Sequence, residues 1–180
     1  MREDIKEVLL TEQQLSEITQ KLGKQISSDY EGKNLVLVSV LKGSVIFMAD
    51  LMRSITIPCF IDFMSVSSYG SGTKSSGNVK IIKDLDKSVE GMDILIVEDI
   101  LDSGRTLSHL KELLETRSAN SIKICTLLDK PDRREANIKP DYVGAVIPDA
   151  FVVGYGLDYD EKYRNLPCVG ILKPSVYGGE

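Results

Sequence analysis

Runs of consecutive apolar residues alternate along this chain with stretches in which apolar residues recur every three or four positions. The runs predict strands buried on both faces of a sheet, and the periodic stretches predict amphipathic helices. Helices are expected after a Thr11 pattern that resembles a capping box, from Ser44 to Arg53, and from Arg105 onward. Strands are expected at residues 35–40, 58–67, 79–82, 94–97, 122–128, 142–147, 151–153 and 168–172. This alternation predicts an α/β fold with a mostly parallel, twisted sheet flanked by helices.

The segment at 94–107, I-L-I-V-E-D-I-L-D-S-G-R-T-L, joins a buried strand to a helix through an acidic loop. Glu98 and Asp99 follow the predicted end of the strand, where open α/β sheets bind ligands. Backbone N–H groups of residues 103–106 can bind a phosphate, because the helix dipole is positive at the helix N-terminus. Carboxylates repel a nearby phosphate unless a cation or a sugar lies between them, so the pattern favours a ribose phosphate bound with Mg²⁺. The simpler alternative is a polar loop whose carboxylates face water.

A second strand-to-helix turn and a long polar loop extend this picture. Lys42-Gly43 follows the strand at 35–40 and is a candidate second anion site at the same sheet edge, although this pair alone is a weak signal. Residues 68–77 are rich in Gly and Ser, with Tyr69 the one large side chain near the start, and they predict a mobile loop. A flexible linker is the alternative. A strand follows at once, however, and a long loop inside a compact domain is more often a functional lid.

Composition predicts a globular protein of the cytoplasm. The 180 residues suit a single domain, and 42% hydrophobic and 27% charged residues are ordinary values. The net charge of −5 argues against nucleic acid or an anionic membrane as the main partner. No apolar run approaches the ~20 residues of a membrane span, and no signal peptide is expected. Cys59, Cys125 and Cys168 lie far apart without metal-ligand spacing and are interpreted as reduced core residues, and His109 as structural.

The same motifs carry a resemblance to a known family. The segment at 94–107 resembles the ribose-phosphate signature of type I phosphoribosyltransferases. D-K-P-D-R-R from Asp129 and P-D-A-F-V-V-G-Y-G-L-D-Y-D-E-K-Y-R-N-L-P from Pro148 resemble the purine-binding half of the hypoxanthine-guanine members. The resemblance covers nearly the whole chain. An acid at Asp102 separates it from adenine, orotate and pyrimidine-regulatory relatives, and Ser103 and Arg105 are mild departures from a Thr and a Lys that animal members more often have.

The resemblance implies one domain, residues 1–180, with the type I phosphoribosyltransferase fold and a small hood over the base from the C-terminal and N-terminal parts. It implies purine salvage, in which a phosphoribosyl group passes from 5-phosphoribosyl 1-diphosphate to N9 of hypoxanthine or guanine with Mg²⁺ as cofactor. The partners would be this diphosphate and 6-oxopurine bases, in a homo-oligomer, a dimer or tetramer, of the cytoplasm.

The family's functional residues map onto this sequence as follows. Asp102 would accept the proton of the base. The diphosphate would be held by Lys42, Gly43 and Arg164. The ribose and the 5-phosphate would be bound by Glu98, Asp99, Ser103, Gly104, Arg105 and Thr106, and the purine by Lys130, Phe151, Val152 and Asp158. Mg²⁺ would take Glu98, Asp99 and Asp158, and Ser68 and Tyr69 would open the mobile loop.

Two alternatives from other classes remain open. A non-catalytic regulator could keep the nucleotide pocket and bind RNA, although the acidic net charge and Asp102 weigh against it. A generic α/β or receiver-like module could hold Mg²⁺ in the acidic pocket without a sugar phosphate. Binding of RNA in the first case, and failure to bind 5-phosphoribosyl 1-diphosphate in the second, would identify them.

Overall fold

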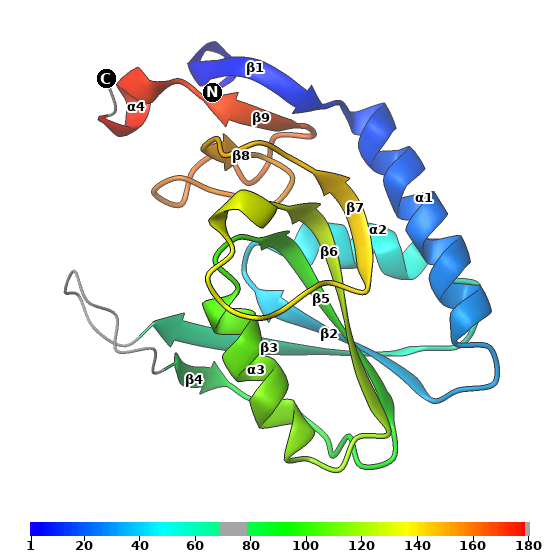
Figure 1. Ribbon diagram of the computed structural model, residues 1–180. Helices are drawn as coiled ribbons and strands as arrows, with labels where there is room; N and C mark the ends of the chain where they lie inside the picture. Colours follow the sequence, from blue (N-terminus) through cyan, green and yellow to red (C-terminus); the bar gives the residue numbers. More distant parts are fainter. Residues whose placement is uncertain (69–78, 179–180) are drawn as a thin grey trace.

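The computed structural model describes residues 1–68 and 79–178 (Figure 1). Its elements follow the chain as η1 (Arg2–Asp4), β1 (Ile5–Leu10), α1 (Glu12–Asp29), β2 (Leu35–Leu41), α2 (Val45–Ser54), β3 (Phe60–Ser68), β4 (Val79–Lys83), β5 (Asp93–Leu101), α3 (Arg105–Glu115), β6 (Ser121–Asp129), η2 (Pro131–Arg133), β7 (Tyr142–Val146), β8 (Val152–Val153), β9 (Val169–Leu172) and α4 (Pro174–Tyr177). Every strand and helix expected from the sequence is present. Thr11 forms the expected capping box with Gln14 at the start of α1.

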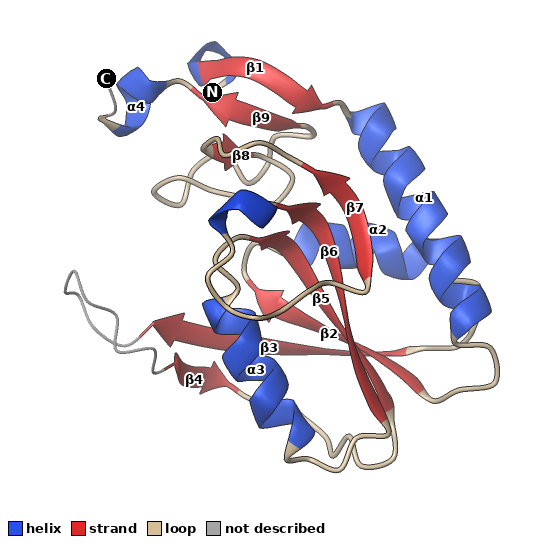
Figure 2. Cartoon of the chain, in the orientation of Figure 1, coloured by secondary structure: helices blue, strands red, loops and turns tan. Residues whose placement is uncertain are grey.

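The main sheet has six strands in the order β4-β3-β2-β5-β6-β7. Strands β3, β2, β5, β6 and β7 are parallel, and only β4 at one edge is antiparallel to its neighbour. Helices α1 and α2 cover one face, where Leu22 and Leu51 join the core, and α3 covers the other through Leu107 and Leu110 (Figure 2). The predicted mostly parallel sheet flanked by helices is therefore confirmed. None of the described helices is long and apolar enough to cross a membrane.

Strand β5 is longer than the apolar run predicts. It continues to Leu101, because its ladder with β6 persists through the pairs Glu98↔Thr126 and Leu101↔Asp129. The expectation that Glu98 and Asp99 follow the end of the strand is therefore wrong. Both carboxylates are carried by the strand itself, and backbone pairing on a rigid sheet fixes their positions.

Residues 1–10 and 150–178, which we call the hood, contain a second sheet. The hood sheet has three antiparallel strands in the order β1-β9-β8 and lies beyond the carboxyl ends of the main strands (Figure 1). Strand β1 was not expected from the sequence. None of its residues is buried, and Val8 is 48% exposed, so it lacks the apolar alternation that marks a strand. Pairing with β9, in the register Ile5↔Leu172, holds it in place.

Two further expectations have different outcomes. Among the cysteines, Cys125 is fully buried, whereas Cys59 and Cys168 are only partly buried, at the margins of the core. The expected mobile loop at 68–77 lies outside the described residues apart from Ser68, which ends β3, and Tyr69 also falls outside them.

Candidate active site

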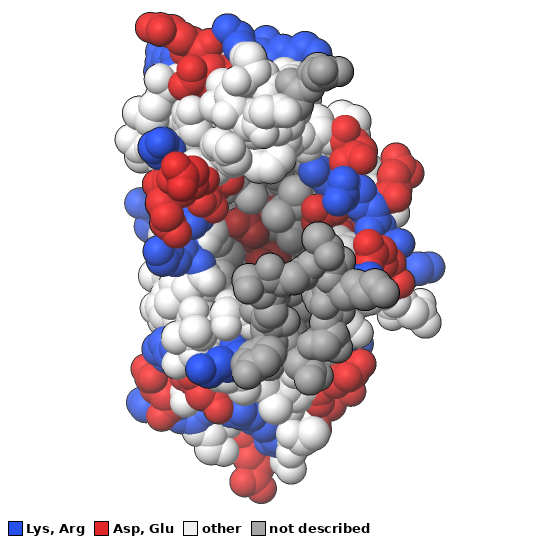
Figure 3. All heavy atoms as spheres, turned by 90° about the vertical axis from the view of Figure 1, so that its left-hand side faces the viewer, with Lys and Arg blue, Asp and Glu red and all other residues white. Residues whose placement is uncertain are grey.

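The carboxyl ends of β2, β5 and β6 meet at one edge of the main sheet, facing the hood. Parallel strands bring the residues at their ends together even when these lie far apart in the chain. A hollow on this face contains acidic side chains between the hood and the main sheet (Figure 3). Most of the residues expected to bind ligands come from the loops and strand ends around this edge.

Two buried carboxylates are the strongest electrostatic feature of this edge. Asp99 is 6% exposed, and the N–H of Ile100 donates to its Oδ1 at 2.8 Å. Burial raises the pKa of Asp99 to about 6. Burial, and next the neighbouring Asp99 carboxylate, raise the pKa of Glu98 well above its usual range. Among the described residues, Glu98 Oε2 is buried and finds no hydrogen-bond donor. Two adjacent buried acids with so few hydrogen-bond donors around them are suited to bind a cation or the hydroxyl groups of a ligand.

The turn after β2, residues 42–44, packs directly against Asp99. The peptide between Leu41 and Lys42 is cis. A Cβ on Gly43 would lie 1.8 Å from Asp99 Oδ2, so only glycine fits at this position. The Lys42 ammonium forms an ion pair with Glu161 at 3.1 Å, which links the turn to the hood.

The hood reaches the same turn through Gly156 and Arg164. A Cβ on Gly156 would lie 2.0 Å from the carbonyl oxygen of Gly43, so the two backbones are in close contact. Arg164 Nη1 donates to the Gly156 carbonyl at 2.8 Å, and Nη2 forms an ion pair with Asp158 Oδ1 at 2.9 Å. Residues expected to bind the diphosphate and the metal thus converge here from the turn after β2, from β5 and from the hood.

The loop after β5, which is expected to bind a phosphate, leads into the N-terminus of α3. Gly104 caps this helix with φ +79°, a left-handed conformation that glycine adopts without strain. A Cβ on Gly104 would also lie 2.6 Å from Ile138 Cγ2. Arg105 forms an ion pair with Glu135. The Asp102 carboxylate, 42% exposed, forms an ion pair with Arg133 Nε at 3.0 Å, so the expected proton acceptor has a cationic partner in this state.

Arg134 supports this loop through hydrogen bonds to its backbone. The charged run at 132–137 predicts a solvated surface stretch. That expectation is wrong for Arg134, whose side chain is 14% exposed. Its guanidinium donates to the carbonyls of Asp102, Leu101 and Ile138 at 3.0, 3.2 and 2.8 Å, and it forms an ion pair with Asp129. A run of alternating charges does not reveal which arginine turns inward, so the pattern gave no signal for this role.

The residues expected to bind the purine base lie at the same edge of the main sheet, on the side toward the hood. Lys130 is 7% exposed and donates to the Ala150 carbonyl at 2.6 Å, and burial lowers the pKa of its ammonium. Val152 is buried in β8 and pairs with Ile171, so its backbone is fixed.

Phe151 is 40% exposed and belongs to an aromatic cluster in the hood. Its ring stacks on Tyr177 with centroids 4.9 Å apart, and Tyr159 meets it edge-on at 5.6 Å. The two tyrosines were not singled out from the sequence, because the folded chain brings them to Phe151 and no sequence pattern marks this contact.

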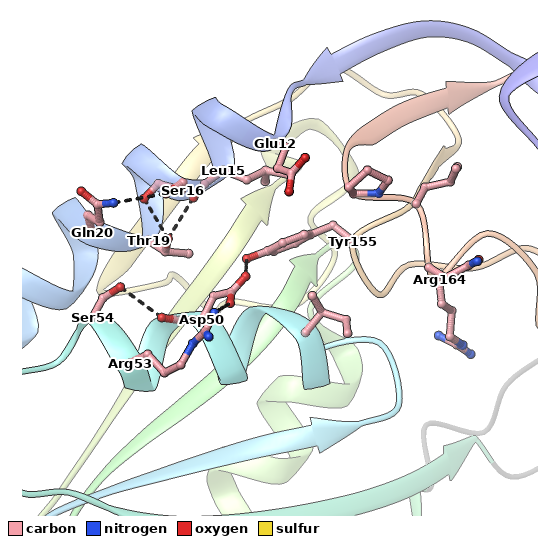
Figure 4. A pocket seen from close by; sticks show the side chains of 14 residues that line it. Glu12, Leu15, Ser16, Thr19, Gln20, Asp50, Arg53, Ser54, Tyr155 and Arg164 are labelled. Atoms are coloured by element: carbon pink, nitrogen blue, oxygen red, sulfur yellow. Dashed lines mark hydrogen bonds and ion pairs between the residues drawn. The ribbon is translucent and has the colours of Figure 1, made fainter.

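A cavity of about 620 Å³ lies beside these residues, between α1, α2 and the hood. Tyr155 and Asp50 form part of its wall, as does Arg164 (Figure 4). No group of three or more His, Cys, Asp or Glu side chains in residues 1–68 and 79–178 is arranged to hold a metal ion alone. A metal at the acidic pair would therefore take further ligands from water or from a bound molecule.

Comparison with known proteins identifies the family. The phosphoribosyl transferase domain profile matches residues 6–160. Hypoxanthine-guanine phosphoribosyltransferase of Staphylococcus aureus strain Mu50 is 58% identical over 177 residues, which are 98% of this chain and 99% of that protein. The chain belongs to the hypoxanthine-guanine phosphoribosyltransferase family.

Further relatives agree with this family assignment. Bifunctional protein TilS/HprT of Listeria monocytogenes serotype 4b is 56% identical over 98% of this chain, but the chain spans only 27% of the length of that protein. The crystal structure of a hypoxanthine phosphoribosyltransferase from Staphylococcus aureus superposes with a TM-score of 0.96 at 58% identity, over 98% of this chain and 96% of that one. A Trypanosoma cruzi hypoxanthine phosphoribosyl transferase gives 0.93 at 44% identity, over 98% and 95% of the chains.

Proposed function

We propose that this phosphoribosyltransferase transfers the phosphoribosyl group of 5-phosphoribosyl 1-diphosphate to N9 of hypoxanthine or guanine, releasing diphosphate. The observation that carries the proposal is a buried acidic pair, Glu98 and Asp99, set between two glycine turns at one sheet edge. Such an arrangement suits a ligand with a hydroxyl-rich sugar in its middle and an anion at each end. The names of the Staphylococcus relatives support the same reaction.

The acidic pair and the two turns would each bind a different part of 5-phosphoribosyl 1-diphosphate. The turn at Lys42 and Gly43, with Arg164, would hold the diphosphate, and the backbone of residues 103–106 would hold the 5-phosphate. The raised pKa values of Glu98 and Asp99 fit a site where a divalent cation restores their charge. Glu98, Asp99 and Asp158 would face Mg²⁺, directly or through water, and the bound ion would neutralise charge on the departing diphosphate.

The purine base would bind between Lys130, which follows β6, and residues of the hood. The Lys130 ammonium only donates, so it suits the 6-oxo group of hypoxanthine or guanine and cannot pair with the amino group of adenine. Phe151 would stack on the purine ring, and the backbone of Val152, with Asp158, would accept from a 2-amino group. Asp102 would take the proton that the base loses as N9 bonds to the ribose, once its ion pair with Arg133 opens.

We propose further that residues 1–180 act as one domain in a homo-oligomer of the cytoplasm. Exposed apolar side chains on α2 and β3 support an oligomer, since Ile46, Phe60 and Ile61 are 39%, 60% and 45% exposed. Light scattering on the purified protein tests this, and a monomer at micromolar concentration would contradict it. Membership of the phosphoribosyltransferase family argues against the receiver-like alternative. The net charge argues against an RNA-binding regulator.

Initial rates with hypoxanthine, guanine, xanthine and adenine test the proposed reaction. We expect turnover with the 6-oxopurines, very little with adenine, and none with excess chelator. Lys130→Ala should lose hypoxanthine activity and narrow the gap to adenine, which a matched hydrogen-bond site can widen to as much as ~10⁴-fold. Full turnover with chelator would contradict the metal assignment, and no turnover with any 6-oxopurine would contradict the function.

A further inference from the structure

A hydrogen bond between the hood and α2 joins two parts of the proposed diphosphate site. Tyr155 follows β8, and its hydroxyl donates to Asp50 Oδ2 on α2 at 2.5 Å. The Tyr155 residue is 7% exposed, and both side chains form the wall of the 620 Å³ cavity between α1 and α2. Figure 4 shows the tyrosine extending from the hood segment to meet the aspartate on the helix.

Both partners are attached directly to the elements that would hold the diphosphate. Helix α2 continues the turn that contains Lys42 and Gly43. On the other side, Tyr155 precedes Gly156, whose α-carbon abuts the Gly43 carbonyl and whose own carbonyl accepts from Arg164. The hydrogen bond therefore closes a ring that runs from the turn through α2, across to the hood, and back to the turn.

The backbone of Tyr155 needs support from its surroundings. Its φ is +50°, a left-handed value that is strained for an aromatic residue. Such a conformation persists where neighbouring contacts hold it. The backbone N–H of Tyr155 donates to the Leu166 carbonyl at 2.8 Å, and the hydroxyl is held by Asp50, which also forms an ion pair with Arg53 at 2.5 Å. Two anchors, one at each end of the residue, keep this strained turn in one conformation.

We propose that Tyr155, through Asp50, is a positioning residue for diphosphate binding. The hydrogen bond keeps the Gly156–Arg164 segment against the Gly43 carbonyl, and so it places the Arg164 guanidinium beside the turn that binds the same diphosphate. Neither Tyr155 nor Asp50 contacts the substrate in this scheme. The inference rests on the proposed function, because it assigns the turn and Arg164 to the diphosphate.

Tyr155→Phe tests the inference, since it keeps the ring and removes only the hydroxyl. We expect the KM for 5-phosphoribosyl 1-diphosphate, measured with Mg²⁺, to rise about tenfold, the effect of one hydrogen bond to a charged group. The kcat and the KM for hypoxanthine should stay within about twofold. A tyrosine that served only the stability of the fold would not move one substrate constant selectively.

Variants of Asp50 test whether the Tyr155 hydroxyl needs only a hydrogen-bond acceptor at this position. Asp50→Asn keeps an oxygen acceptor for the hydroxyl, so its KM for the diphosphate should stay within about threefold of wild type. Asp50→Leu removes the acceptor and should match Tyr155→Phe. The double variant should be no worse than either single one, because both changes break the same bond. Asp50→Leu also supplies the measurement if Tyr155→Phe does not fold.

Tyr142→Phe is the matched control, because its hydroxyl donates to Asp29 at 2.8 Å and joins β7 to α1 away from the turn. It should lower Tm by a similar amount and leave both KM values unchanged. A folded Tyr155→Phe enzyme with a wild-type KM for the diphosphate would overturn the inference. An equal rise in Tyr142→Phe would also overturn it, by showing general loosening. Absence of turnover in the wild-type protein would instead contradict the proposed function.

Discussion

The segment from β5 to α3, which would bind the 5-phosphate, and the hood of this phosphoribosyltransferase are built in opposite ways. We call this segment the phosphate side. On the phosphate side, the residues from Glu98 to Thr106 follow one another along β5, its loop and the first turn of α3. The hood is assembled from both ends of the chain, with Ile5 in β1 paired to Leu172 in β9. One continuous segment therefore supplies the acids and the loop that follows them, whereas pairing between distant strands assembles the hood.

The two regions also differ in how their acidic side chains are paired. On the phosphate side, Glu98 and Asp99 are buried acids with raised pKa values. In the hood, the Tyr163 hydroxyl donates to Asp4 at 3.0 Å, and Lys173 N–H donates to the Asp4 carbonyl at 2.8 Å. Substitutions of the acids at 98, 99 and 102 should therefore change chemistry and pH dependence, and substitutions in the aromatic cluster of the hood should change base affinity by smaller amounts.

The largest effect is expected for Asp102→Asn on the phosphate side. This change keeps the shape of the side chain but removes its charge and its basicity. We expect kcat to fall by roughly 10²–10⁴, the range for a positioned general base, with less change in affinity for 5-phosphoribosyl 1-diphosphate. Single-turnover kinetics would show whether chemistry limits the rate.

The competing explanation is that Asp102 only supports the following helix or anchors Arg133. It predicts lower stability with little loss of turnover in the folded enzyme. A folded Asp102→Asn protein that retains more than about a third of wild-type kcat, with chemistry rate-limiting, would favour this explanation. Arg133→Gln is the control, because it removes the ion-pair partner and leaves the carboxylate in place.

Arg134→Met should give the next largest effect, as a loss of stability. The guanidinium forms an ion pair with the buried Asp129 and donates to three backbone carbonyls. Removing one partner of a buried pair leaves an uncompensated charge, which costs roughly 3–5 kcal/mol. Urea unfolding would measure the loss. Arg133→Met, at an exposed neighbour, should cost less than about 1 kcal/mol, and equal losses in the two variants would contradict the role of Arg134.

The contrast between the two regions also explains how far the sequence could predict this molecule. The parallel sheet and the phosphate side were predictable, because apolar runs and the acids at 98, 99 and 102 lie in one segment. The end of β5 was not, since Glu98 and Asp99 interrupt the apolar pattern while the backbone ladder continues. A run of apolar residues shows which side chains are buried. It does not show how far the backbone hydrogen bonds of a strand continue.

The hood was less predictable for a different physical reason. Strand β1 is held by pairing with β9 and buries no residue of its own, so its side chains carry no periodic signal. The contacts of Tyr155 and Tyr177 join segments that are distant in the chain. Resemblance to a family pointed to Phe151, but not to Tyr177, which stacks on its ring.

Asp99→Asn should show an effect on stability that depends on pH in metal-free protein. The folded-state pKa is raised from 3.8 to about 6, so the folded protein holds this proton more tightly than the unfolded chain. Its stabilising contribution is therefore full below about pH 4 and is lost as the pH rises through 6. The variant does not titrate, so its advantage over wild type should grow from near zero at pH 4 to about 3 kcal/mol at pH 8.

Chemical denaturation at pH 4, 6 and 8 with chelator present measures this difference. Adding Mg²⁺ and 5-phosphoribosyl 1-diphosphate should shrink it at pH 8, because both favour the ionised acids of the wild type. Glu135→Gln is an exposed control, with a side chain that is 53% exposed, and its effect should be small at every pH. A pH-independent difference for Asp99→Asn would show that the carboxyl does not titrate in this range.

The smallest effect is expected in the hood, for Tyr177→Leu. Tyr177 stacks on Phe151 at 4.9 Å with an interplanar angle of 23°, so it covers one face of the ring that would stack on the purine. An aromatic pair contributes about 1 kcal/mol beyond its buried area. Without this support the Phe151 ring gains rotational freedom, and the KM for hypoxanthine should rise about fivefold while kcat stays within twofold.

Steady-state kinetics with Tyr177→Phe as the matched variant decides between two roles for this ring. The phenylalanine keeps the stack and should behave like wild type, which would assign the effect to the ring and not to the hydroxyl. If Tyr177 instead occupied the place of the base, its removal would open that place and the KM for hypoxanthine would fall. A fall would therefore make Tyr177 a competitor of the purine, whereas a rise supports the idea that the C-terminal helix backs the stacking face of Phe151.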